Sequence, residues 1–146
     1  MKFFIASPWR NKEAVKDLTD ALTLRGHTAY SFLQSGANLA TGTSVIEEFK
    51  EFGRSMVDWE DAPLIKNIFD SEMQALRDCD AVLLLEPSGS SSLAEAGIAY
   101  GLGKQVILVG LVEHPEVVYR ICGSRYATIE AFLDDLDNIA NGSGGK

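Results

Sequence analysis

Two short, uninterrupted apolar runs constrain the fold of this chain more than any other feature. They are AVLLL at 81–85 and VILVG at 106–110. Runs of this length without polar alternation are typical of parallel strands that are buried on both faces of a sheet. FFIAS at 3–7, HTAYSF at 27–32 and a weaker segment near Tyr126 give three further expected strands. The sequence therefore predicts a five-stranded sheet that is covered on both sides.

Amphipathic helical patterns alternate with these runs. In the first pattern, Val15, Leu18 and Leu22 recur at helical spacing within residues 12–24, and Gly26 follows as a terminator. Further helices are expected at 64–78, 93–102, 115–121 and 129–139. This alternation predicts a single three-layer α/β domain with a parallel sheet of strand order 2-1-3-4-5, the flavodoxin-like or Rossmann-like arrangement.

The segment between the second and third expected strands departs from the alternation. It holds a loop, QSGANLATGTS, and helical patterns at about 44–56 and 64–78. Such a long insertion in a compact domain is more often functional than idle. At 146 residues the chain fits one domain, which we place at 1–140, and the Gly- and Ser-rich residues 141–146 are expected to form a flexible tail.

Charge and residue content exclude several classes of partner. A formal net charge of −8 gives nucleic-acid phosphates no general attraction, so we expect no nucleic-acid partner. No apolar run is long enough to span a membrane, and the N-terminus lacks the apolar core of a signal peptide. We therefore expect a cytoplasmic protein without a membrane partner. The two cysteines and two histidines lack metal-ligand spacing, so neither a metal nor a cofactor is expected.

Polar residues follow the first and third expected strands, whose carboxyl ends flank the place where ligands bind in a sheet of this order. After the first strand come the candidate substrate-binding residues Ser7, Trp9 and Arg10. After the third come Ser88, Gly89, Ser90, Ser91 and Ser92, and then the carboxylate of Glu95. The sequence contains neither a G-x-x-x-x-G-K-[ST] loop nor a helix-opening G-x-G-x-x-G turn, which disfavours an ATPase or a dinucleotide oxidoreductase.

Glu95 has two interpretations. Ser92-Leu93-Ala94-Glu95 matches the capping box S-x-x-E, in which a serine hydroxyl and a glutamate carboxylate satisfy free N–H groups at a helix start. Alternatively, a carboxylate in the first turn of a helix, after a loop that follows a buried strand, is placed to stay ionised beside a ligand. The first interpretation makes Glu95 structural, and the second makes it a nucleophile.

Four motifs resemble one known family. They are FFIASP near the start, DCDAVLLL at 78–85, PSGSSSLAEAG at 87–97 and AYGLGKQV at 99–106. Together they are similar to the nucleoside 2-deoxyribosyltransferase superfamily, which includes deoxynucleoside 5′-monophosphate N-glycosidases. The resemblance implies a hydrolase or transferase that cleaves the bond between sugar and base in a nucleoside or nucleotide. It also implies a homo-oligomer, a dimer or higher.

The resemblance further implies roles for individual residues. The family's nucleophilic glutamate, which opens the helix after the third strand and attacks the anomeric carbon of the sugar, corresponds to Glu95. The family's second acid lies on the helix before the third strand and corresponds by spacing to Glu72. Asp70 lies two residues away, and the choice between these two candidates stays open. Arg10 and the serines at 88–92 correspond to groups that handle phosphate.

Competing interpretations stay open for these residues and for the activity. Arg10 also fits a solvated loop residue, and Trp9 fits a core aromatic as well as a side chain that stacks on a base. Related α/β domains, including TIR-like ones that bind or cleave NAD derivatives, can keep a glutamate after a similar strand. A non-catalytic nucleotide-binding module, or a TIR-like signalling and interaction module, is therefore the alternative function. Fold alone does not separate these classes.

Overall fold

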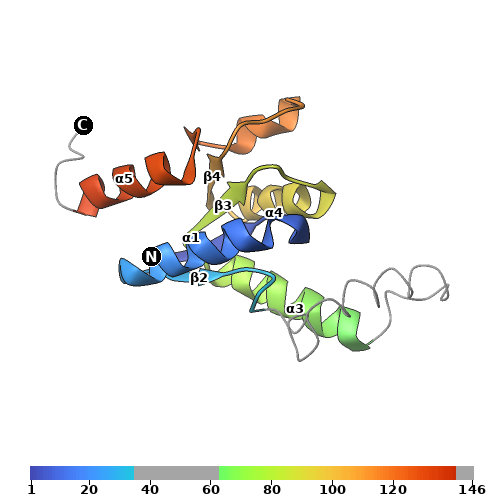
Figure 1. The fold of residues 1–146 in the computed structure, drawn as a ribbon. Helices are drawn as coiled ribbons and strands as arrows, with labels where there is room; N and C mark the ends of the chain where they lie inside the picture. Colours follow the sequence, from blue (N-terminus) through green and yellow to red (C-terminus); the bar gives the residue numbers. More distant parts are fainter. Residues whose placement is uncertain (35–62, 141–146) are drawn as a thin grey trace.

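The computed structural model describes residues 1–34 and 63–140 of the chain (Figure 1). The strands are β1 (Lys2–Ala6), β2 (Thr28–Tyr30), β3 (Ala81–Leu85), β4 (Gln105–Val109) and β5 (Ser124–Tyr126). The helices are α1 (Lys12–Leu24), α3 (Pro63–Asp78), α4 (Ser90–Gly101) and α5 (Ile129–Ala140), with the 3-10 helices η1 (Trp9–Asn11) and η4 (Val117–Ile121). The predicted helix over about 44–56 and the predicted tail at 141–146 lie outside the described residues.

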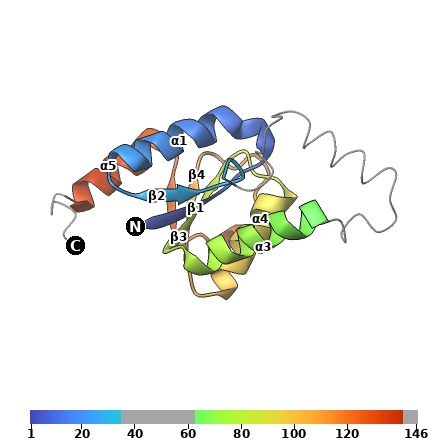
Figure 2. The same cartoon turned by 90° about the horizontal axis from the view of Figure 1, so that it is seen from below.

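The strands form one parallel sheet of order β2-β1-β3-β4-β5, which confirms the predicted fold class. Helices cover both faces of the sheet, with α1 and α5 on one side and α3 and α4 on the other (Figures 1 and 2). Every residue of the central strand β3 is buried, as a continuous apolar run requires. The edge strands β2 and β5 have only 3 residues each, which limits the exposed backbone at the edges.

The pleat of β1 divides the hydrophobic core into two layers. Phe3 and Ile5 pack in the layer under α1 and α5, whereas Phe4 and Ala6 pack in the layer under α3 and α4. This division follows because successive side chains of a strand point to opposite faces of the sheet. Full burial of one large apolar side chain is worth roughly 1.5–3 kcal/mol, so each layer holds its pair of helices firmly against the sheet.

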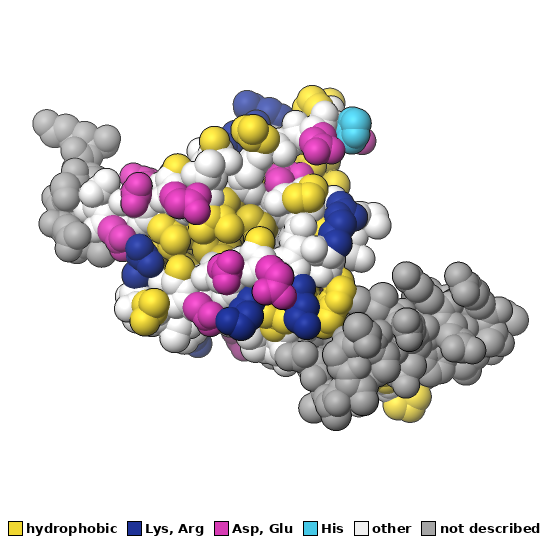
Figure 3. All heavy atoms as spheres, viewed as in Figure 1, with side chains coloured by type: hydrophobic (Ala, Val, Ile, Leu, Met, Phe, Trp, Pro, Cys, Tyr) yellow, Lys and Arg dark blue, Asp and Glu magenta, His cyan; other side chains and the backbone are white. Residues whose placement is uncertain are grey.

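Charged side chains lie over the outer face of α1 and α5. Acidic and basic side chains are interspersed there, with apolar surface visible between the two helices (Figure 3). An ion pair between Arg25 Nε and Asp137 Oδ1, at 2.8 Å, joins the end of α1 to α5. This ion pair therefore helps to hold α1 and α5 together.

Local sequence sets the helix ends, with two differences from expectation. Gly26 and Gly103 adopt positive φ angles of 78° and 75°, the left-handed region that commonly ends a helix. The helix expected from residue 93 begins at Ser90, because Gly89 is extended and acts as its N-cap. The helix expected at 115–121 is the shorter 3-10 helix η4, because the backbone is still extended at Glu116.

Candidate active site

Two loops at the carboxyl ends of β1 and β3 lie side by side. Arg10 Nη2 donates a hydrogen bond to the backbone oxygen of Ser88 at 3.0 Å. Asn11 Nδ2 donates to the backbone oxygen of Pro87 at 2.9 Å and to Ser7 Oγ at 2.8 Å. The side chain of Ser7 is buried in this junction. The structure thus brings Ser7 and Arg10 next to the loop that contains Ser88.

Trp9 lies at the same edge of the sheet and packs toward the segment that follows β2. Its ring centroid lies 4.9 Å from that of Phe32, with the two rings tilted by 45°. Lys12 Nζ lies 5.3 Å from the Trp9 centroid, within the range of a cation–π interaction. These contacts give Trp9 a packing role, and its binding to a base stays a prediction.

The loop after β3 is held by a network that sequence analysis does not identify. Ser88 N donates to Glu86 Oε2 at 2.9 Å, and Ser88 Oγ lies 2.9 Å from Tyr119 Oη. Tyr119 Oη also donates to Glu86 Oε1 at 3.1 Å. No local pattern could have linked Tyr119 in η4 to this loop, because only the fold brings the two together. Ser90 and Ser91 are exposed in the first turn of α4.

The capping-box interpretation of Glu95 is wrong. Ser92 is the third residue of α4, and its hydroxyl accepts from the N–H of Gly89 at 2.7 Å and donates to the Gly89 oxygen at 2.9 Å. Glu95 is the sixth residue of α4 and lies in the second turn, where N–H groups already have partners within the helix. Helix capping therefore does not explain this carboxylate. The expected place in the first turn, where the helix N-terminus would keep the carboxylate ionised, is wrong as well.

Glu95 and Glu72 lie on the inward sides of two helices that contact each other. Glu72 stands one turn after Ile68 and one turn before Leu76, both of which are buried, so it shares the buried side of α3. Glu95 stands one turn before Ala99, which is fully buried in α4. The two half-buried carboxyl groups thus occupy the region between α3 and α4.

Burial changes the acidity of both carboxyl groups. It raises the pKa of Glu95 to about 8, and the negative charge of Glu72 is the second cause. Burial also raises the pKa of Glu72 above its ordinary value. Two neighbouring carboxyl groups that are kept from water favour states in which one of them carries a proton. The pair can therefore offer an ionised oxygen and an O–H donor at the same time.

Tyr30, at the end of β2, is a third member of this site that sequence analysis does not identify. Burial, followed by the charges of Glu72 and Glu95, raises the pKa of Tyr30 to about 12. Its ring stacks on Phe4 of the neighbouring strand, with centroids 5.5 Å apart. The run HTAYSF indicates only a strand. The pairing of β2 with β1 is what carries the tyrosine to the carboxyl pair.

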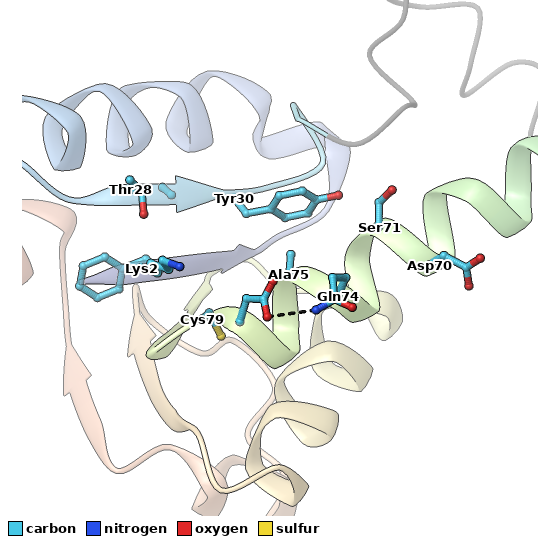
Figure 4. Close-up of a pocket in the computed structure, with 11 residues that line it drawn as sticks. Lys2, Thr28, Tyr30, Asp70, Ser71, Gln74, Ala75 and Cys79 are labelled. Atoms are coloured by element: carbon cyan, nitrogen blue, oxygen red, sulfur yellow. Dashed lines mark hydrogen bonds between the residues drawn. The ribbon is translucent and has the colours of Figure 1, made fainter.

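Asp70 lies apart from the carboxyl pair. It is exposed, and its position two residues from Glu72 turns it roughly 200° around the helix. It lines a cavity of about 600 Å³ between β2 and α3, which Tyr30, Ser71 and Gln74 also line. Figure 4 shows the Asp70 carboxylate directed away from the Tyr30 ring. Of the two candidates for the second acid, the fold brings Glu72 to Glu95.

The described residues 1–34 and 63–140 contain no cluster of three or more His, Cys, Asp or Glu side chains placed to bind a metal ion. Within the same residues, every helix is too short or too polar to cross a lipid bilayer.

Comparison with known proteins shows that this architecture is shared with several solved structures. No protein-family model and no curated protein matches the sequence. A 2-deoxyribosyltransferase from Bacillus psychrosaccharolyticus matches with a TM-score of 0.60 and 17% identity, over 92% of this chain and 91% of the other. The CMP N-glycosidase BcmB from Clostridium botulinum matches with a TM-score of 0.52 and 17% identity, over 94% and 98%.

A conserved protein from Enterococcus faecalis V583 also matches, with a TM-score of 0.62 and 12% identity, over 95% of this chain and 98% of the other. At these identities the comparisons establish a shared fold. The resemblance that the sequence motifs indicate is confirmed at that level.

Proposed function

We propose that this protein is an enzyme that cleaves the bond between sugar and base in a nucleoside or nucleotide, with Glu95 as the nucleophile. The observation that carries the proposal is the half-buried pair of Glu95 and Glu72, which sits beside the carboxyl edge of a parallel sheet and has no role in capping a helix. The fold shared with a 2-deoxyribosyltransferase and with a CMP N-glycosidase supports the same class of reaction.

The carboxyl pair keeps a proton up to about pH 8, and the chemistry begins when that shared proton lies on Glu72, which leaves Glu95 ionised. A Glu95 oxygen attacks the anomeric carbon as the bond to the base breaks, and its negative charge stabilises the oxocarbenium-like transition state. The electron pair of the broken bond goes to the base, which takes the proton from Glu72. A covalent ester between the sugar and Glu95 results.

The ester then reacts with water or with a second base. Water attacks the anomeric carbon and gives a proton to the ionised Glu72, which releases the sugar and restores the Glu95 carboxylate. A second base would give the transferase outcome by the reverse of the first step.

Arg10 and the exposed first turn of α4 are the groups that we propose to bind the rest of the substrate. Helix geometry leaves the N–H groups of Ser90 and Ser91 without partners within the helix, and such groups bind anions well. Arg10 already holds the neighbouring loop through Ser88, which places its charge at the same edge. A phosphate or a sugar hydroxyl would bind there. The hydroxyls of Ser88 and Ser92 are engaged in bonds within the protein.

Release of base from a panel of nucleosides and 5′-monophosphates, followed by chromatography, tests the proposal. We expect Glu95→Gln to lower turnover by orders of magnitude because it removes both the attacking oxygen and the charge. Glu116→Gln is a matched control, since Glu116 is exposed in the loop before η4. Equal rates for wild type and Glu95→Gln would refute the nucleophile. Tight binding of a nucleotide without any release of base would favour the non-catalytic binding module.

A further inference from the structure

The hydroxyl of Tyr30 has a property that the proposed chemistry does not use. Tyr30 Oη is buried and has no hydrogen-bond partner among the residues that the structure describes. Nearly all buried polar groups in proteins have a partner, because leaving one unpaired costs stability. A buried hydroxyl that is left unpaired at this cost is therefore a candidate to bind a ligand.

The surroundings of this hydroxyl show where such a ligand would lie. The Tyr30 ring is fixed by stacking on Phe4, and Figure 4 shows it between β2 and α3 with the hydroxyl directed away from the start of the strand. Tyr30 packs on the same side of the sheet as α3 and α4. The charges of Glu72 and Glu95 act on it, although neither carboxylate bonds to its hydroxyl. The phenol and the two carboxyl groups thus lie in one region of the fold, and the Tyr30 hydroxyl there has no partner among the described residues.

A ligand group that contacts both the Tyr30 hydroxyl and a carboxylate must be both a hydrogen-bond acceptor and a donor. It accepts from the Tyr30 hydroxyl and donates to a carboxylate oxygen, and a hydroxyl group does both. A sugar with its anomeric carbon at Glu95 has two candidate oxygens nearby. The ring oxygen can only accept, and a bond to it would oppose the positive charge that it gains in the transition state. The 2′-hydroxyl can do both, and bonds to it strengthen as that transition state forms.

We infer that Tyr30 is a specificity-determining residue that selects a ribosyl over a 2-deoxyribosyl substrate, by donating its hydroxyl to the 2′-hydroxyl while that hydroxyl donates to Glu95. The inference rests on the proposed function. A 2-deoxyribosyl substrate leaves the Tyr30 hydroxyl buried and unpaired, and sites of this kind discriminate strongly against an analogue that lacks the bonded hydroxyl.

Four kcat/KM values test the inference: wild type and Tyr30→Phe, each with a ribonucleoside or ribonucleotide and with its 2′-deoxy counterpart carrying the same base. We expect wild type to prefer the ribosyl substrate by at least about 10-fold, and Tyr30→Phe to lose most of that preference. The rate with the 2′-deoxy substrate should change by less than about 3-fold. Tyr30→Phe should fold normally, since it removes an unpaired buried hydroxyl and keeps the ring.

Tyr126→Phe is the control for a general effect of losing a phenol. Tyr126 lies on β5, at the other edge of the sheet, and its hydroxyl bonds to Asp135. Its substitution should leave the preference unchanged. Equal use of both sugars by wild type, or an unchanged preference in Tyr30→Phe, would overturn the role of Tyr30 while leaving the proposed reaction intact.

Binding gives a second readout that does not depend on turnover. Calorimetry with Glu95→Gln, whose side-chain oxygen can still accept a hydrogen bond, compares the same two sugars without cleavage. Adding Tyr30→Phe should reduce the preference for the ribosyl ligand, and equal affinities before and after that change would overturn the inference. If wild type releases no base from any substrate, the proposed reaction fails, and the binding comparison still decides the role of Tyr30.

Discussion

Replacing Glu95 with glutamine should make the protein more stable at alkaline pH while lowering the proposed base release by orders of magnitude. Burial and the charge of Glu72 raise the pKa of Glu95 from 4.5 to about 8, so the native state binds this proton more tightly than the unfolded chain does. The raised pKa therefore contributes to the free energy of unfolding. This contribution is fully present below about pH 4.5 and is lost as the pH rises to about 8. Glutamine does not titrate, so the variant escapes this loss.

The magnitude follows from the pKa. Since one pKa unit corresponds to about 1.4 kcal/mol, a pKa of about 8 in place of 4.5 gives a loss on the order of 5 kcal/mol across this range. Glu72, whose pKa burial also raises, shares the same surroundings. The figure is therefore an upper limit for Glu95 alone. Such a loss is a large part of the roughly 5–15 kcal/mol that holds a typical domain folded.

Urea unfolding of both proteins, at several pH values from about 5 to about 9, measures the effect as a difference in the free energy of unfolding. We expect the two proteins to be close at the acidic end and to diverge progressively in favour of Glu95→Gln. Glu116→Gln, at an exposed position, should follow wild type throughout. Parallel curves for wild type and Glu95→Gln, or a less stable Glu95→Gln at the alkaline end, would refute the burial argument.

Four further predictions follow from the same site and fold. For base release by the wild-type protein, kcat/KM should fall as the pH rises through about 8, because the carboxyl pair then loses its shared proton and Glu72 has none to give to the base; an undiminished rate well above that pH would contradict the role of the pair. Glu72→Gln should lower kcat by roughly 10²–10⁴-fold, as loss of a general acid does. Asp70 is exposed, so Asp70→Asn should keep kcat within about twofold of wild type. Equal effects of the two changes in a base-release assay would reject the assignment of the second acid. Ser92→Ala should reduce the free energy of unfolding by about 1–3 kcal/mol, because Gly89 N loses its partner, yet retain base release at matched folded concentration. Light scattering should give at least a dimer, as the resemblance implies, and a mass near the 15.9 kDa of one chain at high concentration would contradict that.

The fold was predictable because its main determinants are local. The run at 81–85 coincides with β3. Its side chains are apolar on both faces of the strand, so it is stable only at the centre of a sheet that is covered on both sides. The alternation and the right-handedness of parallel connections predicted a doubly wound sheet, and 2-1-3-4-5 is one of the common strand orders of that class. Gly26 and Gly103 marked two helix ends, because glycine adopts the left-handed conformation at little cost. The pairing of the loops at the carboxyl ends of β1 and β3 followed from the same order.

The choice between Glu72 and Asp70 shows where sequence reasoning became incomplete. The spacing of Ile68, Glu72 and Leu76 places all three on one side of α3, and this spacing is visible in the sequence. It indicates a glutamate on the buried side of the helix. It does not indicate which helix covers that side, and the proximity of α4 is a property of the packed structure.

The sequence by itself determined the sheet, its helical layers and the candidacy of Glu95. Only the tertiary structure decided that Glu95 is no helix cap, that Glu72 lies near it and that Tyr30 lies near both. The physical reason is that acidity and hydrogen bonding depend on what surrounds a group in space. Tyr30, Glu72 and Glu95 come from a strand and two helices far apart in the chain, and the desolvation that raises their pKa values exists only after these elements pack together.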